Sequence, residues 1–243
     1  MLIRALVIVM LLCSSGWGAV DLNGDADYIT VSDTGLSLNR NFSIAGWVYA
    51  DVSDTMAIIG HGCGAWLVRV VSGLKFNFLE SNVQSLLTSS TNFSAQTWTH
   101  FVFVMNTTGG MGFYLNGVID GTAGTSNNFS AVTCDAQIGI DEDCSGCGNA
   151  NYFNGKLSDL AIWDIEISAD DALKLAKSRG KRMPLQIKPS NLIAFWPLDD
   201  GVDGSILNTA SNFYKDIDST NHGTATDADG DSLNSAELIL TYP

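Results

Sequence analysis

One stretch constrains the fold of this chain more than any other: Trp98–Gly121, WTHFVFVMNTTGGMGFYLNGVIDG. Thr99–Met105 is an unbroken run of β-favouring residues, which is the pattern of a strand covered on both faces. Asn106–Gly110 is polar and glycine-rich and predicts a turn. Asn116-Gly117 tolerates positive φ at both positions, so it predicts a tight two-residue hairpin. Because a strand covered on both faces needs a second layer above it, the stretch predicts a β-sandwich.

Short β-favouring runs separated by turn residues recur along the rest of the chain, with hardly a helical pattern between them. The one good helical pattern is Ala169–Arg179, which Ser168 can cap and which has acids in its first turn and bases toward its end. The sequence therefore predicts an all-β sandwich with one short helix. Further strands are predicted at Tyr28–Val31, Phe42–Tyr49, Met56–Gly60, Ala65–Val71, Leu74–Leu79, Val83–Leu87, Gln137–Ile140 and within Tyr152–Asp164.

The chain divides into four predicted parts. Residues 1–18 form a leader, residues 20–168 the sandwich, residues 169–182 the short helix with a basic linker, and residues 183–243 a C-terminal extension. The extension has two apolar pieces, Leu192–Leu198 and Leu238–Tyr242, joined by a polar stretch too poor in apolar residues for a core of its own. We therefore expect the extension to dock on the sandwich.

The start of the chain predicts export. Met1–Gly18 carries one positive charge, Arg4, then an apolar run from Ala5 to Leu12 and small residues near Gly18. This is the pattern of a secretory signal peptide, with cleavage expected after Gly18 or Ala19. The apolar run is too short to span a bilayer and no other stretch is long enough, so we expect no membrane insertion. The expected location is secreted, extracellular or at the cell surface.

The charge balance narrows the range of partners. The chain has 12 basic and 26 acidic residues and a formal net charge of −14, and loss of the leader removes Arg4 and no acid. Such a surface repels nucleic acid and anionic membranes, and it favours solubility and cation binding. We therefore expect no nucleic-acid partner.

Four cysteines remain beyond the leader. An even number in an exported chain indicates disulfides, and four cysteines allow three connectivities. A four-thiolate zinc site is the alternative, but only one Cys-x-x-Cys pair is present and the expected compartment is oxidising. The disulfide candidates are Cys63, Cys134, Cys144 and Cys147.

Four stretches, in order along the chain, carry a family resemblance. They are VDLNGDADYITVSD, NFSIAGWVYAD, WTHFVFVMNTTGGMGFYLNGVIDG, and IGIDED followed by YFNGKLSDLAIWDIEIS. Together they resemble the successive strands of laminin-G-like and pentraxin-like domains, over about Val20–Ser168. The resemblance implies a concanavalin A-like, two-sheet antiparallel jelly-roll sandwich. Because this fold hosts lectins, enzymes, adhesins and structural modules, function has to be argued from the site.

The same resemblance implies a calcium site. In pentraxin-like members an acidic loop follows the strand that matches Gln137–Ile140, and its positions here are Asp141, Glu142 and Asp143. Calcium takes several oxygen ligands, which such a loop can supply, although an acidic solvated loop is the alternative. The partner loop of those relatives resembles His61–Ala65, which has no carboxylate. We hypothesise that a disulfide from its cysteine to the acidic loop tethers loops that calcium would otherwise bridge.

Ligand contacts are expected beside this acidic loop. Asn151 and Tyr152 are candidates at its rim, and His61 and Trp66 are candidates on the facing loop. Trp66 either stacks on a sugar or packs in the core, and the core is favoured. Catalysis is not expected, because glucanases of this fold class alternate carboxylates along one strand and the chain has no Glu-x-Asp-x-x-Glu.

These observations favour a secreted module that binds extracellular carbohydrate, or a surface glycoconjugate, through loops at one end of the sandwich with the help of calcium. The alternative is a structural or adhesion module of a surface layer, filament or particle. Such a module would be a homo-oligomer joined by strand exchange of the C-terminal tail. A glycoside hydrolase is a third class, and it needs a pair of carboxylates across a groove.

Overall fold

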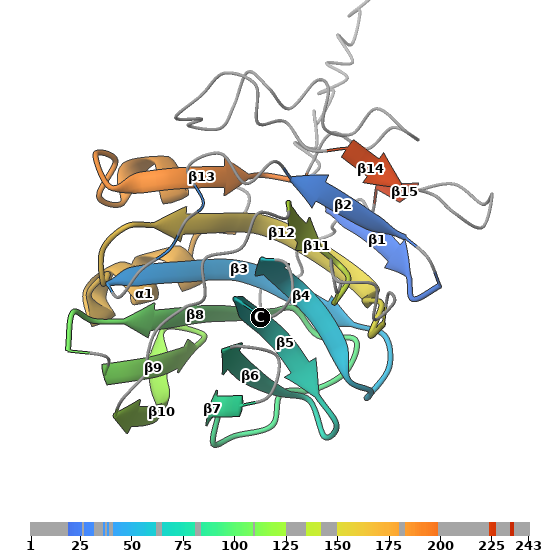
Figure 1. The fold of residues 1–243 in the computed structure, drawn as a ribbon, viewed down its shortest axis with the longest axis horizontal. Coiled ribbons are helices and arrows are strands. Elements are labelled where there is room, and N and C mark those ends of the chain that lie inside the picture. Colours follow the sequence, from blue (N-terminus) through green and yellow to red (C-terminus); the bar gives the residue numbers. More distant parts are fainter. Residues whose placement is uncertain are drawn as a thin grey trace, which may run out of the picture.

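The computed structural model of the chain contains two antiparallel β-sheets packed face to face (Figure 1). It describes residues 19–25, 27–31, 36, 38, 41–61, 65–80, 84–108, 110–124, 135–141, 150–179, 183–198, 224–226 and 234–235. The elements in chain order are β1 (Val20–Asn23), β2 (Tyr28–Val31), β3 (Phe42–Ala50), β4 (Met56–His61), β5 (Trp66–Val71), β6 (Lys75–Glu80), β7 (Gln84–Thr88), β8 (Thr99–Met105), β9 (Gly110–Leu115), β10 (Val118–Gly124), β11 (Ala136–Ile138), β12 (Asn154–Trp163), α1 (Ala169–Ala176), the 3₁₀ turn η1 (Met183–Gln186), β13 (Leu192–Trp196), β14 (Thr224–Thr226) and β15 (Asn234–Ser235).

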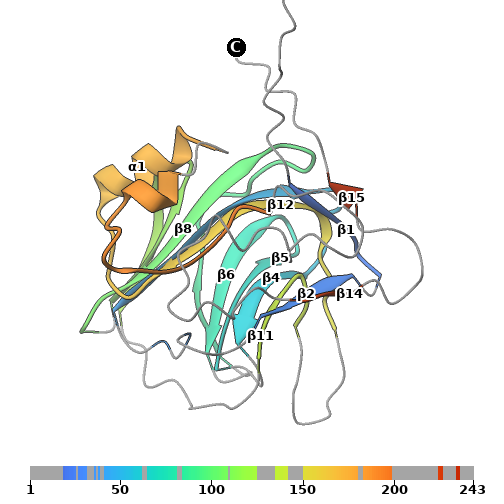
Figure 2. The same cartoon turned by 90° about the horizontal axis from the view of Figure 1, so that it is seen from above.

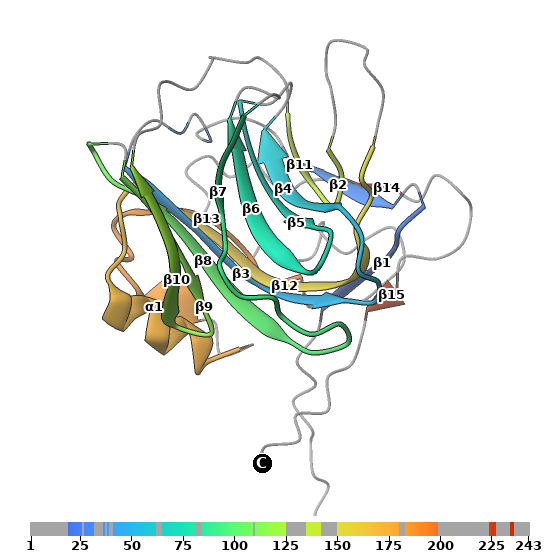
Figure 3. The ribbon, with the colours of Figure 1, turned by 90° about the horizontal axis from the view of Figure 1, so that it is seen from below.

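The two sheets have eight and seven strands. The eight-stranded sheet has the order β10-β9-β8-β3-β12-β1-β15, and β13 also pairs with β12. The seven-stranded sheet has the order β14-β2-β11-β4-β5-β6-β7. Both sheets are curved and lie one over the other, with α1 on the outer side of the eight-stranded sheet (Figures 2 and 3). The predicted two-sheet antiparallel jelly-roll sandwich with a short helix is confirmed.

The β8–β10 meander lies where its sequence predicts. Every residue of β8 is buried, and the turn between β9 and β10 has φ values of 48° at Asn116 and 82° at Gly117. Phe103 of β8 stacks on Phe78 of β6 in the other sheet, with ring centroids 3.9 Å apart and an interplanar angle of 13°. The meander is therefore covered by a second layer, and aromatic stacking joins the two sheets.

Helix α1 begins at the predicted cap. The backbone N–H of Asp171 donates to Ser168 Oγ at 3.2 Å, which satisfies one of the free donors of the first turn. The helix ends at Ala176, three residues before the predicted end, and Ser178 Oγ donates to the carbonyl oxygen of Lys174 at 2.7 Å. Its buried residues include Ala172 and Leu175, so one side of the helix packs on β8 and β10.

The C-terminal extension contributes strands to both sheets. β13 lies antiparallel to β12, with Leu160 opposite Trp196. β14 pairs with β2 and β15 pairs with β1. These two short strands come from the polar stretch in which the sequence predicts none, while the predicted apolar piece Leu238–Tyr242 lies outside the described residues.

Candidate functional site

The candidate site lies where the chain leaves β11 and returns to β12. Gly139 has a φ of 86°, and a Cβ there would come within 2.6 Å of Leu22 Cδ1, so the position requires glycine. Its N–H donates to the carbonyl oxygen of Ile58 at 3.0 Å, and its own carbonyl oxygen accepts from the N–H of Phe153 at 2.8 Å. Two residues later, Asp141 forms an isolated antiparallel bridge with Ala150. The backbone that carries Asp141 is therefore irregular, and it is held by the hydrogen bonds of Gly139 and by the bridge to Ala150.

Asn151 orients the carboxylate of Asp141. Asn151 has a φ of 55°, a conformation that asparagine tolerates better than most residues. Its carbonyl oxygen accepts from the N–H of Ala57 at 2.8 Å, which ties it to β4. Its side-chain Nδ2 donates to Asp141 Oδ2 at 3.1 Å. The structure therefore brings two of the predicted site residues, Asp141 and Asn151, into contact. Tyr152 follows as a partly exposed residue.

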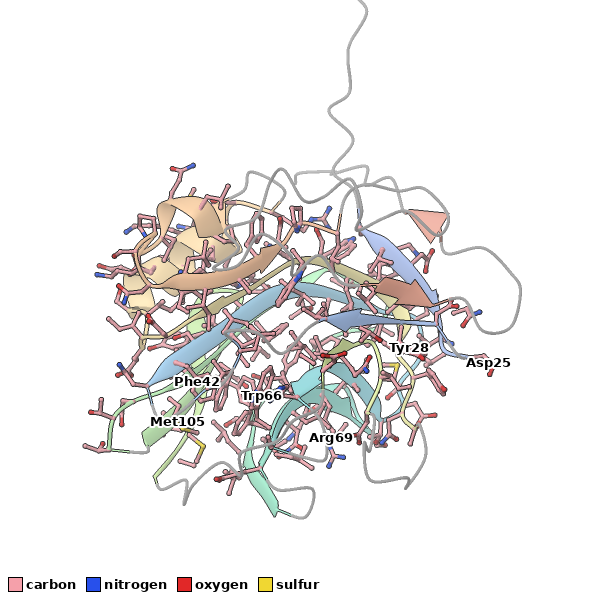
Figure 4. The ribbon with its side chains drawn as sticks, turned by 45° about the horizontal axis from the view of Figure 1, so that its top comes forward. Asp25, Tyr28, Phe42, Trp66, Arg69 and Met105 are labelled. Atoms are coloured by element: carbon pink, nitrogen blue, oxygen red, sulfur yellow. The ribbon has the colours of Figure 1, made fainter. Side chains whose placement is uncertain are left out.

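A cation lies within electrostatic range of Asp141: Arg69 of β5, a strand that β4 separates from β11. The pKa of Arg69 is lowered, because the effect of burial is larger than the opposing effect of the negative charge of Asp141. Arg69 Nε donates to Asn77 Oδ1 at 3.0 Å, and Asn77 Nδ2 in turn donates to the carbonyl oxygen of Leu87 at 3.0 Å. Sequence reasoning missed Arg69, although it is the one charged residue in the strand WLVRVV. Figure 4 marks its position. Asp141, Asn151 and Arg69 are called the rim cluster below.

The described residues do not bring His61 and Trp66 to the rim cluster. His61 pairs with Ala136 at the start of β11, whereas Asp141 follows the end of that strand. The ring centroids of His61 and Trp66 are 6.1 Å apart, and the two residues are 4% and 1% exposed. Trp66 is labelled in Figure 4. The core position that the sequence favours for Trp66 is the one observed, and a ring buried to this extent offers no face to a sugar. The expectation that both residues line the site is therefore wrong for the described structure.

The remaining predicted site residues are Glu142, Asp143 and the four cysteines, and all of them lie outside the described residues. Within the described part of the chain, no group of three or more His, Cys, Asp or Glu residues could hold a metal. At the rim cluster the described donors are one carboxylate and one amide, with a guanidinium opposing the carboxylate. Calcium takes six to eight oxygen ligands, so these described donors alone do not fit a calcium ion.

Comparison with known proteins identifies the family. A laminin-G family model of the concanavalin A-like lectin/glucanases superfamily matches residues 23–172. The chain belongs to this superfamily. The match runs from the end of β1 into α1, so it contains the whole rim cluster, while β13 and the tail strands lie beyond it.

Three solved structures of this superfamily's jelly-roll fold are similar to the chain. The heptameric SAP-like pentraxin of Limulus polyphemus is 18% identical, over 65% of this chain and 81% of its own, with a TM-score of 0.52. A Bacteroides ovatus protein proposed to bind carbohydrate is 17% identical, over 93% of this chain and 61% of its own, with a TM-score of 0.67. The CBM40 domain of the Ruminococcus gnavus IT-sialidase, bound to α2,3-sialyllactose, is 8% identical, over 65% of this chain and 96% of its own, with a TM-score of 0.54. At these identities the likeness shows the fold alone.

No curated protein matches the chain. In the part of the chain that the structure describes, every helix is too short or too polar to cross a bilayer.

Proposed function

We propose that this chain is a secreted, non-catalytic module that binds extracellular carbohydrate or a surface glycoconjugate through the rim cluster. Membership of a lectin and glucanase superfamily supports a sugar ligand, and two of the similar structures are described by carbohydrate binding. The observation that carries the proposal is the fixed arrangement of Asp141, Asn151 and Arg69. It offers a carboxylate, an amide and a guanidinium that are each held by a hydrogen bond to another part of the sandwich.

These three groups suit sugar hydroxyls. A hydroxyl both donates and accepts hydrogen bonds, so it can donate to Asp141 while it accepts from Asn151 or Arg69. Because each of these side chains is already held by another part of the sheet, binding costs little ordering entropy. Tyr152, partly exposed beside Asn151, supplies an aromatic face of the kind that lines ligand sites. Calcium enters the proposal as an additional ligand of Asp141, together with Glu142 and Asp143.

The absence of catalysis is part of the proposal. Glycoside hydrolysis uses two carboxyl groups about 5–9.5 Å apart on either side of the scissile bond. The described part of the rim cluster has one, Asp141, and a guanidinium opposes its charge. A single carboxyl group cannot supply both the acid and the nucleophile or base that this reaction needs. We therefore expect no release of reducing sugar from any glycan that the protein binds.

A glycan array, run with and without a chelator, tests the proposal. We expect specific binding that Asp141→Asn weakens at least tenfold, because the substitution removes the charge and one acceptor from the rim cluster. Asp170→Asn, at an exposed position in α1, is the matched control and should bind as the wild type does. Binding lost with the chelator supports the calcium part. No binding in either condition removes the carbohydrate proposal.

A structural or adhesion module is the second candidate, and one observation favours it. β14 pairs with β2 over only three residues, and β15 pairs with β1 over only two. Few hydrogen bonds therefore oppose the transfer of these strands to a neighbouring copy. Light scattering on the full chain and on a chain that ends at Leu198 separates the candidates, with circular dichroism to verify folding. Monomers in both samples would exclude assembly through the tail.

A further inference from the structure

A buried arginine lies on the outer side of the eight-stranded sheet, apart from the rim cluster. Arg179 follows the end of α1 and is 5% exposed. Its Cζ lies 4.0 Å from the centre of the Trp98 ring and 5.7 Å from that of Trp47. Both distances are in the range of cation–π contacts. The guanidinium is therefore held against the sheet by aromatic rings.

The rings belong to a row that crosses neighbouring strands. Trp47 and Tyr49 project from β3, and Trp98 directly precedes β8. The Tyr49 and Trp98 ring centroids are 5.6 Å apart, and Lys156 Nζ lies 5.1 Å from the Tyr49 ring centre. Trp47, Tyr49 and Trp98 all remain partly exposed. We call these three rings and Arg179 the outer-face cluster.

Within the described residues, the guanidinium of Arg179 has no hydrogen-bond acceptor. Its Nε, Nη1 and Nη2 atoms are buried, and none has a hydrogen-bond partner in the structure. Burial lowers the pKa of Arg179 to about 10, and the carboxylate of Asp159 acts in opposition from beyond hydrogen-bond distance. The side chain is therefore charged at neutral pH. Native proteins seldom bury a charge without satisfying its hydrogen bonds, and each exception calls for an explanation such as a ligand.

The chemistry of the cluster indicates what would satisfy it. A guanidinium presents its N–H groups as a planar fork that matches a carboxylate. Partly exposed aromatic rings beside a few charged groups, here Arg179 and Lys156, are typical of small-ligand sites, in which the rings carry the contact area and the charges set orientation. Since no hydrogen bond holds the fork, a rotation about its terminal torsions breaks none and can turn N–H groups toward a ligand on the rings. The long-range field of this acidic chain repels anions, so an anionic ligand needs such a local cation.

We infer that the outer-face cluster is a second saccharide site, specific for a sugar that carries a carboxylate. The carboxylate accepts hydrogen bonds from Arg179, and the sugar ring stacks on Trp98 and Tyr49. This site deepens the proposed carbohydrate-binding function and rests on it for the ligand class. It is separate from the rim cluster and uses none of its residues.

Titration calorimetry with trigalacturonic acid and its uncharged methyl ester tests the inference. We expect the acid to bind the wild type at least tenfold more tightly than the ester does. Arg179→Met keeps an unbranched apolar side chain and should remove most of that preference. Lys177→Met, which removes an exposed charge nearby, is the matched control and should keep it. Trp98→Ala should weaken acid and ester together.

Thermal unfolding separates a ligand site from a purely structural role. Removing one charge of a buried pair destabilises because the other is left uncompensated, whereas replacing both charges is often neutral or stabilising. Arg179→Met is therefore also made together with Asp159→Asn, its buried counter-charge, and the double variant should melt close to the wild type. Equal affinities for acid and ester, full binding by Arg179→Met, or a large loss of melting temperature in the double variant would each overturn the inference. If a neutral glycan binds and responds to Asp141→Asn, but trigalacturonic acid binds no more tightly than its ester, the second site is refuted while the proposed function stands.

Discussion

Replacing Phe103 by alanine tests whether the central meander is packed between two layers. Phe103 is fully buried in β8. Its ring stacks on that of Phe78 in the opposite sheet, with the ring centroids 3.9 Å apart. The ring centroids of Phe42 and Phe113 lie 5.7 Å and 5.2 Å from that of Phe103. The substitution therefore removes the contact that most directly joins the two sheets, and it leaves a cavity that fixed neighbouring strands cannot close.

The expected cost follows from that environment. A buried Phe→Ala substitution costs about 3–5 kcal/mol, and the aromatic contacts place Phe103 in the upper half of this range, at about 4 kcal/mol. For a domain of this size, about 1 kcal/mol corresponds to about 2–4 °C, so the melting temperature should fall by about 8–16 °C. With a urea m-value of about 3 kcal/mol/M, the midpoint should fall by about 1.3 M.

Urea unfolding followed by tryptophan fluorescence measures this cost. Val118→Ala, in the same meander at a position 65% exposed, is the control and should change the free energy of unfolding by no more than about 0.5 kcal/mol. A double-mutant cycle of Phe78→Leu with Phe103→Leu should give a coupling of about 0.5–1.5 kcal/mol. A loss below about 1 kcal/mol for Phe103→Ala, or no coupling, would refute the two-layer packing.

Three further predictions follow from single contacts. Burial lowers the pKa of His100 from 6.5 to about 3. As the pH falls below 6.5, the unfolded chain therefore binds a proton at this histidine that the folded chain does not bind. The free energy of unfolding then falls by up to about 1.4 kcal/mol for each pH unit of acidification. His100→Gln should lose less stability than the wild type between pH 7 and pH 5, and equal losses in urea titrations would contradict this. Ser168→Ala should cost about 1 kcal/mol through the lost helix cap, seen as about 2–4 °C in melting temperature, and an unchanged melting temperature would argue against the cap. Finally, the hypothesis that a disulfide tethers the loop of Cys63 to the acidic loop predicts a peptide that joins Cys63 to Cys144 or Cys147 in non-reduced peptide maps. A Cys63 that is free, or joined only to Cys134, would contradict it.

The meander was predictable because its signals are local. Seven consecutive apolar or β-favouring residues mark Thr99–Met105, and the observed strand has the same bounds. Asn116-Gly117 specifies its turn by backbone preference alone. The tail strands β14 and β15 carry no such signal, because a polar segment becomes a strand here only by pairing with the free edges of β2 and β1. Edge pairing is a property of the partner strand, which the tail's own sequence does not contain.

The site was predictable only in part. Asp141 and Asn151 are ten residues apart, and the resemblance to pentraxin-like loops was enough to place them together. Arg69 reaches the same point through the pairing of β5 with β4, so its charge could be noticed in the sequence but not located. His61 and Trp66 were placed wrongly, because the sequence gives no register between β4 and β11, and the register directs both residues into the core.

Asn151 of the rim cluster, and Asp159 whose charge acts on Arg179, lie on backbone that departs from regular strand geometry. Asn151 and Asp159 have φ values of 55° and 51°, which cost energy in most residues and persist only where the surroundings hold them. Distant partners hold them here. Asn151 bonds to Ala57 of β4, and the N–H of Asp159 donates to the carbonyl oxygen of Pro197 at 3.0 Å. Asp159 also sits in an irregularity of the β12–β3 register between Ser158 and Ala161, and such bulges re-aim side chains. Since alternation in a sequence assumes regular strands, it fails at those positions where long-range pairing bends the chain.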